Sequence, residues 1–239
     1  MTTSAPVPAL DRDLIARLRF DVIAASWTTD TLETLLSDGA LSALMRDSRL
    51  PALVELAGVT DPAATLTRFF VLGQPERASA LDAALPTLGA AGLETLGLAA
   101  TIDEAEATSA LVVTRGCGKF APKREDAQAG EGASSPKTPT LPTMHDPDEE
   151  APELEVESDP WMSALYDLRP HAATLPVGDR DWWVTSDPGE MRTGKPLADD
   201  HVMGVGGATR TLLGMTVRES VDSALDLGCG CGIQALYLA

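Results

Sequence analysis

A glycine-rich segment near residue 230 combines residue types that can hold a nucleotide-like ligand. Residues 224–236 read ALDLGCGCGIQAL. This pattern predicts a short buried strand over residues 224–227, then a glycine turn, then a helix that begins after Gly232. Glycine adopts positive φ without a Cβ clash, and it lets a ligand approach the backbone closely. A strand, a glycine turn and a helix N-terminus in this order are typical of nucleotide-binding folds.

Two spacings within the segment point to different ligands. Gly230, Gly232 and Ala235 fit the dinucleotide-binding pattern GxGxxA. Asp226, two residues before the first glycine of the run, instead favours a ligand that carries positive charge, such as a sulfonium, over a pyrophosphate. A third interpretation is a glycine-rich turn in some other α/β protein, because a motif match is a hypothesis until its structural context is known.

The run DLGCGCG at residues 226–232 closely resembles motif I of the class I S-adenosylmethionine-dependent methyltransferases. Upstream, WWVTSD at residues 182–187 and DHVMGVGGAT at residues 200–209 are similar to bacterial methyltransferases with a helical or winged N-terminal domain, relatives of the enzymes that methylate release-factor glutamine or ribosomal RNA. The resemblance implies S-adenosylmethionine as cofactor, in contact with Asp226, Gly228, Cys229, Gly230, Gly232, Gly206 and Gly207.

The same resemblance implies roles for these residues. The three turn glycines are expected to shape the cofactor loop, and Asp226 to anchor it and balance the cofactor's positive charge. The methyl acceptor is expected to be an amide or base nitrogen of a protein or RNA. The Asn-Pro-Pro-aromatic motif of such enzymes is absent, because the sequence has no asparagine. We therefore expect a fragment of a longer methyltransferase, inactive alone, with its catalytic residues beyond residue 239.

Composition narrows the classes of function. The formal net charge of −18 argues against a general nucleic-acid binder, because affinity for phosphates depends on Lys and Arg. Residues 86–98 contain neither, which argues against sequence-specific DNA binding. No signal peptide and no apolar run of about 18 residues is present, which predicts a cytoplasmic protein without a membrane segment. The three cysteines predict neither a disulfide framework nor a metal site.

The hydrophobic pattern predicts an α+β chain of two domains. Residues 1–187 are expected to form an α-rich, winged-helix-like domain, and residues 188–239 the beginning of a Rossmann-like methyltransferase domain. Helix starts are predicted at Asp30, at Asp61-Pro62 and at Pro75, and one further helix over residues 211–218. Strands are predicted over residues 108–114, 162–168 and 182–185. Trp182 and Trp183 are either core residues or a base-stacking platform.

An acidic, proline-rich insertion is predicted over residues 118–160. It holds seven of the seventeen prolines, and its part from residue 144 onward has eight acids and no Lys or Arg. With few large apolar side chains it cannot offset its ordering entropy, so it is expected to be disordered. This insertion supports an alternative function, a truncated non-catalytic protein-interaction module. A nucleotide- or dinucleotide-binding domain is the other alternative.

Overall fold

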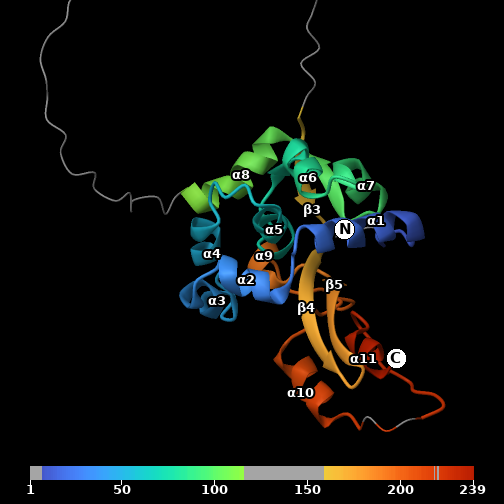
Figure 1. Cartoon of the computed structure of the whole chain (residues 1–239). Helices are drawn as coiled ribbons and strands as arrows, with labels where there is room; N and C mark the ends of the chain where they lie inside the picture. Colours follow the sequence, from blue (N-terminus) through green and yellow to red (C-terminus); the bar gives the residue numbers. More distant parts are fainter. Residues whose placement is uncertain (1–6, 116–158, 218, 220) are drawn as a thin grey trace, which may run out of the picture.

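The computed structural model describes residues 7–115, 159–217, 219 and 221–239, and it confirms the α+β class (Figure 1). The helices are α1 (Arg12–Ala24), α2 (Thr29–Leu35), α3 (Asp38–Leu44), α4 (Leu50–Glu55), α5 (Pro62–Leu66), the π-helical η1 (Thr67–Val71), α6 (Ala78–Ala84), α7 (Gly89–Thr95), α8 (Glu104–Arg115), α9 (Glu190–Thr193), α10 (Gly207–Met215) and α11 (Ile233–Leu238). The strands are β1 (Glu76–Arg77), β2 (Ala99–Ile102), β3 (Trp161–Ala164), β4 (Asp167–Leu175) and β5 (Gly178–Ser186).

Short polar side chains start several of the helices. Asp61 accepts hydrogen bonds from the first-turn amides of α5, and Pro62 is the first helical residue, which confirms the predicted start. The start predicted at Asp30 is displaced, because Thr28 caps α2 through the Thr31 amide. The helix predicted from Pro75 begins only at Ala78, because Glu76 and the next residue form β1.

The strand predicted over residues 108–114 is wrong, since this segment belongs to α8. Its β-branched residues favour a strand, but the local start signal for a helix is stronger. The Asp103 carboxylate accepts a hydrogen bond from the Glu106 amide at 2.7 Å. Glu104 and Glu106 also place negative charge in the first turn, where the helix dipole favours it. A strand of a winged-helix wing is therefore absent at this position.

Two separate antiparallel sheets form from the strands. The first has the order β1-β3-β2, so its central strand comes last in the sequence. The second is the β4–β5 hairpin, in which Asp167 pairs with Ser186 at the open end and Leu175 with Gly178 at the tip. The strand predicted over residues 182–185 is confirmed within β5. The one predicted over residues 162–168 is divided, because β3 ends at Ala164 and β4 begins at Asp167.

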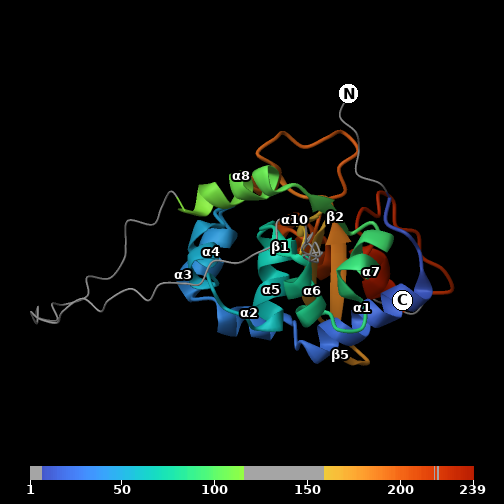
Figure 2. The same ribbon diagram turned by 90° about the horizontal axis from the view of Figure 1, so that it is seen from above.

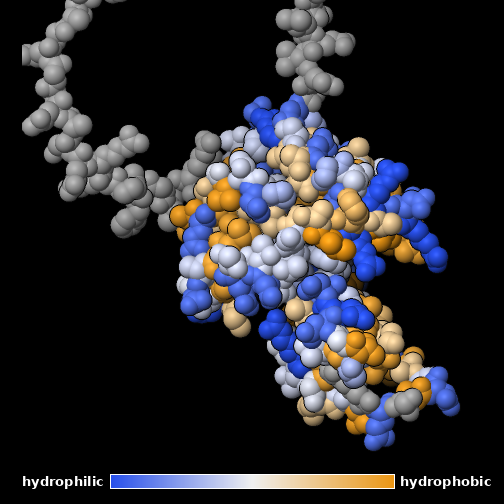
Figure 3. Space-filling view, viewed as in Figure 1, coloured by the Kyte–Doolittle hydropathy of each residue, from blue (hydrophilic) through white to orange (hydrophobic). Residues whose placement is uncertain are grey.

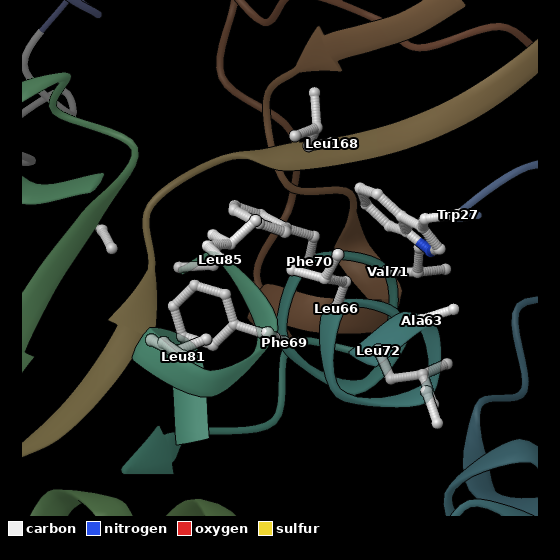
Figure 4. Close-up of a cluster of buried hydrophobic side chains, with 14 of the residues drawn as sticks. Trp27, Ala63, Leu66, Phe69, Phe70, Val71, Leu72, Leu81, Leu85 and Leu168 are labelled. Carbon is white, nitrogen blue, oxygen red and sulfur yellow. The ribbon is translucent and has the colours of Figure 1, made fainter. Parts of the chain in front are cut away.

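The main core gathers around α5 and η1. In the view from above, α5 lies between α4, α2 and α6 (Figure 2). The Trp27 ring packs on Phe70 with centroids 5.9 Å apart, and Phe69 meets Phe70 edge to face (Figure 4). The Trp27 indole donates a hydrogen bond to the Thr67 hydroxyl at 3.0 Å. The long segment α5–η1 thus forms the centre of the helical part.

A second, smaller core joins the hairpin to the two C-terminal helices. Val184 of β5, Leu213 of α10 and Ile233 of α11 are buried together, with Trp182 and Tyr237 packed against them. These elements form the lower part of the molecule in Figure 1, where hydrophobic surface also gathers (Figure 3). Exposed apolar residues of this part include Met203, Leu212, Met215, Val217, Val221, Leu225 and Leu227.

Most of the predicted insertion, residues 118–158, lies outside the described residues. Its last two residues are described and contact the helical part: the Asp159 carboxylate accepts hydrogen bonds from the Ser79 amide and hydroxyl. Among the described residues, no helix is both long and apolar enough to cross a membrane.

Candidate functional site

The glycine turn has the backbone conformation that its sequence predicts. Gly228, Gly230 and Gly232 have φ values of 73°, 50° and 75°, which L side chains rarely adopt. The Gly232 amide donates a hydrogen bond to the Cys229 carbonyl at 2.7 Å and closes the turn directly before α11. A helix after Gly232 is therefore confirmed, and so is the need for glycine at these three positions.

The buried strand predicted over residues 224–227 is wrong. This segment is irregular, and Leu225 and Leu227 are 81% and 84% exposed. A strand needs a neighbour that pairs with its backbone, and neither described sheet has an edge paired with these residues. The turn is consequently attached to the rest of the fold through α11 and not through a sheet.

One carboxylate oxygen of Asp226 lacks a hydrogen-bond partner within the described residues. This atom, Oδ2, is buried from solvent. A buried carboxylate oxygen is unfavourable unless a donor or a positive charge meets it. Among the other predicted contacts, Cys229 is exposed and Cys231 packs on the smaller core. The described residues contain no group of side chains suited to a metal ion.

The structure brings the upstream glycine segment close to the turn. Gly206 is the N-cap of α10 and Gly207 its first residue, so this helix starts before the residues 211–218 predicted for it. The Gln234 amide of α11 donates a hydrogen bond to the Thr209 carbonyl at 3.2 Å. A side chain at Gly230 would lie 3.9 Å from the Met203 carbonyl oxygen. Two segments that the sequence separates by more than twenty residues thus meet.

An aromatic group on the hairpin holds α11. His171 and Trp182 are paired across β4 and β5 with stacked rings, and the Tyr237 ring meets Trp182 edge to face at 5.1 Å. His171 Nε2 and the Tyr237 hydroxyl are 3.0 Å apart and share a hydrogen bond. Because α11 follows directly on the turn, this aromatic group also fixes where the turn lies. Sequence patterns gave no sign of it.

Acidification is expected to loosen α11. Burial, and next the positive charge of Arg210, lower the pKa of His171 from its ordinary value of 6.5. The unfolded chain therefore binds the proton more tightly, so this contribution to stability is complete above about pH 6.5 and is lost as pH falls below it. The protection factors of the α11 amides in hydrogen exchange, which correct for the intrinsic rate at each pH, should therefore fall as the pH drops below about 6.5. The His171→Gln variant, which has no proton to gain there, should lack this fall in protection.

The two tryptophans of β5 lie mainly against apolar neighbours. The Trp183 indole donates a hydrogen bond to the Trp27 carbonyl at 2.8 Å, and its ring packs on the main core. Trp182 belongs to the aromatic group beside α11. Both line an apolar groove of about 570 Å³ between α1, β5 and α11, together with Ile15, Leu18 and Leu236.

A second cavity, which we call the hairpin-base cavity, lies at the open end of the β4–β5 hairpin. It measures about 550 Å³, and its polar lining includes Asp47, Asp167, Arg169, Ser186, Asp187 and Glu190. Arg192 and His201 also line it, as do Gly204 and Gly206, whereas the turn at residues 226–232 does not. Only Gly206 of the predicted cofactor contacts therefore belongs to this cavity.

Arg192 is the buried centre of this region, and sequence analysis did not single it out. Its guanidinium donates hydrogen bonds to Asp167 Oδ1 at 2.8 Å and to the carbonyls of Phe70, Tyr166 and Ala164. Burial lowers the pKa of Arg192 from its ordinary value, and the Asp167 carboxylate opposes that effect. The residue thereby links the helical part to β3 and β4. Nothing in the sequence around Arg192, which follows Pro188 by four residues, indicates that this arginine is buried.

Comparison with known proteins identifies one domain family in the helical part. Residues 24–111, from the end of α1 into α8, match a family model described as a domain of unknown function (DUF7059). This region excludes the glycine turn and the hairpin. No curated protein and no solved structure matches the chain.

Proposed function

We propose that the glycine turn is the cofactor loop of an S-adenosylmethionine-dependent methyltransferase. The observation that carries this proposal is the conformation of the turn: all three glycines have positive φ, the turn lies directly before a helix, and Asp226 just before it has one buried carboxylate oxygen without a hydrogen bond among the described residues. Among the described residues, apart from the adjacent ones, no atom lies within 4 Å of a Cβ built at Gly228 or Gly232. The turn is thus shaped for reasons other than internal packing, and a ligand has room to approach its backbone.

The residues present fit a cationic cofactor. The buried Asp226 Oδ2 lacks a donor, and a ligand with hydroxyl groups or positive charge supplies one. Gly206 and Gly207 lie on the segment that approaches Gly230, so they are the second contact region. Cys229 is exposed at the turn and presents a small side chain there. The bound cofactor supplies a methyl group, and the protein contributes mainly by orienting it towards its acceptor.

The acceptor in this proposal is an amide or base nitrogen of a protein or RNA. The accompanying architecture is a winged-helix-like domain before a Rossmann-like domain. The long β4–β5 hairpin after the helices is compatible with a wing.

The Gly230→Val substitution tests the cofactor loop. A branched residue at φ 50° is strained by about 1–3 kcal/mol, and its side chain points towards the Met203 carbonyl. We expect the affinity for S-adenosylmethionine to fall by a comparable free energy in the full-length protein encoded by the gene, as measured by isothermal titration calorimetry.

A matched control separates backbone strain from loss of the site. Gly58 has φ 75° and open space around it, but it lies between α4 and α5, away from the turn. The Gly58→Val variant should have similar backbone strain and bind the cofactor normally. Equal cofactor affinity in Gly230→Val and wild type would remove the turn from the cofactor site.

A dinucleotide is the second candidate ligand, since Gly230 and Gly232 have the positive φ values that its binding pattern can use. Titration of NADH under the same conditions distinguishes the two. Saturable NADH binding that Gly230→Val abolishes, without S-adenosylmethionine binding, favours the dinucleotide.

A further inference from the structure

The glycine turn contains two cysteines, Cys229 and Cys231, with only Gly230 between them. Both thiols are free, and Cys229 is exposed whereas Cys231 is half-buried. The whole sequence has three cysteines, so two of them belong to one tight turn. Two neighbouring thiols can give up two electrons by forming a disulfide, which a single thiol cannot do within one chain.

The turn keeps the two cysteines close to each other. The Gly232 amide donates a hydrogen bond to the Cys229 carbonyl at 2.7 Å, so Cys229 and Cys231 are the first and third residues of a closed turn. Consecutive Cα atoms are about 3.8 Å apart, so two residues apart in a folded-back turn they lie within the roughly 4.4–6.8 Å that a disulfide spans. Gly230 has a φ of 50° and no side chain, so the backbone between the thiols can adjust.

The two cysteines differ in their surroundings. Cys229 is exposed, so an oxidant in solution reaches its sulfur more easily. Cys231 packs on the smaller core, which is formed by Val184, Leu213 and Ile233. Ile233 is also the first residue of α11. A bond that draws the Cys231 sulfur towards Cys229 therefore disturbs the contact that holds the start of α11.

A bridge across one intervening residue is easily reduced. The loop that it closes is very short, so loop closure contributes little stability to it. Exposed or strained disulfides exchange readily with other thiols, whereas structural disulfides resist reduction. The two cysteines are therefore suited to reversible oxidation and not to a permanent crosslink.

We propose that Cys229 and Cys231 form a redox switch within the glycine turn, with hydrogen peroxide as the oxidant. The Cys229 thiolate attacks the peroxide, the O–O bond breaks, hydroxide leaves and a sulfenic acid forms. The Cys231 sulfur then attacks that of Cys229, so that the S–S bond forms and the hydroxyl leaves with the Cys231 proton as water. A dithiol reductant restores both thiols by disulfide exchange.

The disulfide reshapes the turn and loosens α11 from the smaller core. Formation of the bridge does not depend on methyl transfer. Only the expectation that the bridge also lowers the affinity for S-adenosylmethionine rests on the proposed function.

Oxidation of the chain in a Cys117→Ser background tests the bridge, because Cys229 and Cys231 are then its only thiols. With equimolar hydrogen peroxide, we expect both thiols to be lost together. The tryptic peptide that begins at Glu219 contains both cysteines and should become lighter by the mass of two hydrogen atoms. Dithiothreitol should restore both thiols and the original mass.

Cys229→Ser and Cys231→Ser, each in the same background, separate the pair from the single thiols. After treatment with glutathione disulfide, each variant should keep a stable glutathione adduct. In the two-cysteine chain the second thiol should displace glutathione and close the bridge. Stable glutathione adducts or disulfide-linked dimers of the two-cysteine chain would overturn the proposal.

Hydrogen exchange at constant pH tests whether the bridge acts on α11. Oxidation should lower the protection factors of the α11 amides several-fold in the two-cysteine chain. Cys231→Ser, compared with its own untreated state, should show no such fall. A bridge that leaves the α11 protection unchanged contradicts the switch. Neither measurement involves S-adenosylmethionine, so failure of the switch is distinguishable from failure of the proposed function.

Discussion

Replacing Arg192 with Met is expected to lower the free energy of unfolding by about 3–5 kcal/mol. The guanidinium is 9% exposed and donates to Asp167 and to three backbone carbonyls on different elements. Methionine fills part of the volume and supplies no donor. Asp167, whose side chain is 7% exposed, then loses its buried partner and keeps only Arg169, which is on the surface. The carbonyls of Phe70, Tyr166 and Ala164 also lose their donor.

Urea denaturation followed by circular dichroism measures this loss. Arg192→Lys keeps the positive charge but not the fork of donors, so its loss should be intermediate. Arg180→Met is the matched control, because Arg180 lies exposed near the hairpin tip, and among the described residues its guanidinium donates only to the adjacent Asp179 carbonyl. Arg180→Met should change the free energy of unfolding by no more than about 0.5 kcal/mol. A similarly small effect in Arg192→Met would show that Arg192 is not a structural link.

Trp27→Ala is also expected to lower the free energy of unfolding by about 3–5 kcal/mol. The side chain is fully buried, its ring packs on Phe70, and its indole donates to the Thr67 hydroxyl. Alanine leaves a cavity between α1 and η1 that the surrounding helices fill only in part. The Trp27 carbonyl also accepts a hydrogen bond from the Trp183 indole of β5. A shift of the backbone at Trp27 would therefore loosen the β4–β5 hairpin as well.

The Trp27→Phe variant removes the hydrogen bond to Thr67 but keeps most of the buried volume, so it separates these two contributions to stability. Trp161→Phe is its control. Trp27→Phe should destabilise less than Trp27→Ala, in the same urea titration. The Trp161 indole N–H is buried without a hydrogen bond in the described structure, so replacing it removes no such bond. We expect Trp161→Phe to be near neutral. Equal losses in the two Phe variants would show that the contact to Thr67 contributes nothing.

Local chemistry explains which elements could be predicted from the sequence. Asp61-Pro62 starts α5 because the cap and the fixed φ of proline act within three residues. The positive φ values of the turn glycines are local in the same way. The strand predicted over residues 108–114 was wrong because β-branched composition is only a weak preference for a strand. The Asp103 cap, a few residues earlier, favours a helix more strongly.

The remaining features depend on contacts between distant residues. The partners of Arg192 lie 25 to 122 residues away, and the hydrogen bond between His171 and Tyr237 spans 66 residues. No spacing rule encodes such pairs. The strand over residues 224–227 was wrongly predicted for a related reason: an apolar run becomes a strand only when another strand pairs with it. The hairpin-base cavity likewise combines α3–α4, β4–β5, α9 and a loop, so only the fold shows it.

The strand order β1-β3-β2 has a consequence for synthesis on the ribosome. β2 ends at Ile102 and the central strand begins at Trp161, so the two flanking strands exist before the strand that joins them. At about 5–20 residues per second, the ribosome needs roughly 3–12 s to reach β3 after completing β2. During that interval the nascent helical part lacks Met162 and Ala164, and the inner edges of β1 and β2 are unpaired. The first sheet and the core that it covers can therefore be completed only after residues 161–164 have been synthesised, however early the helices form.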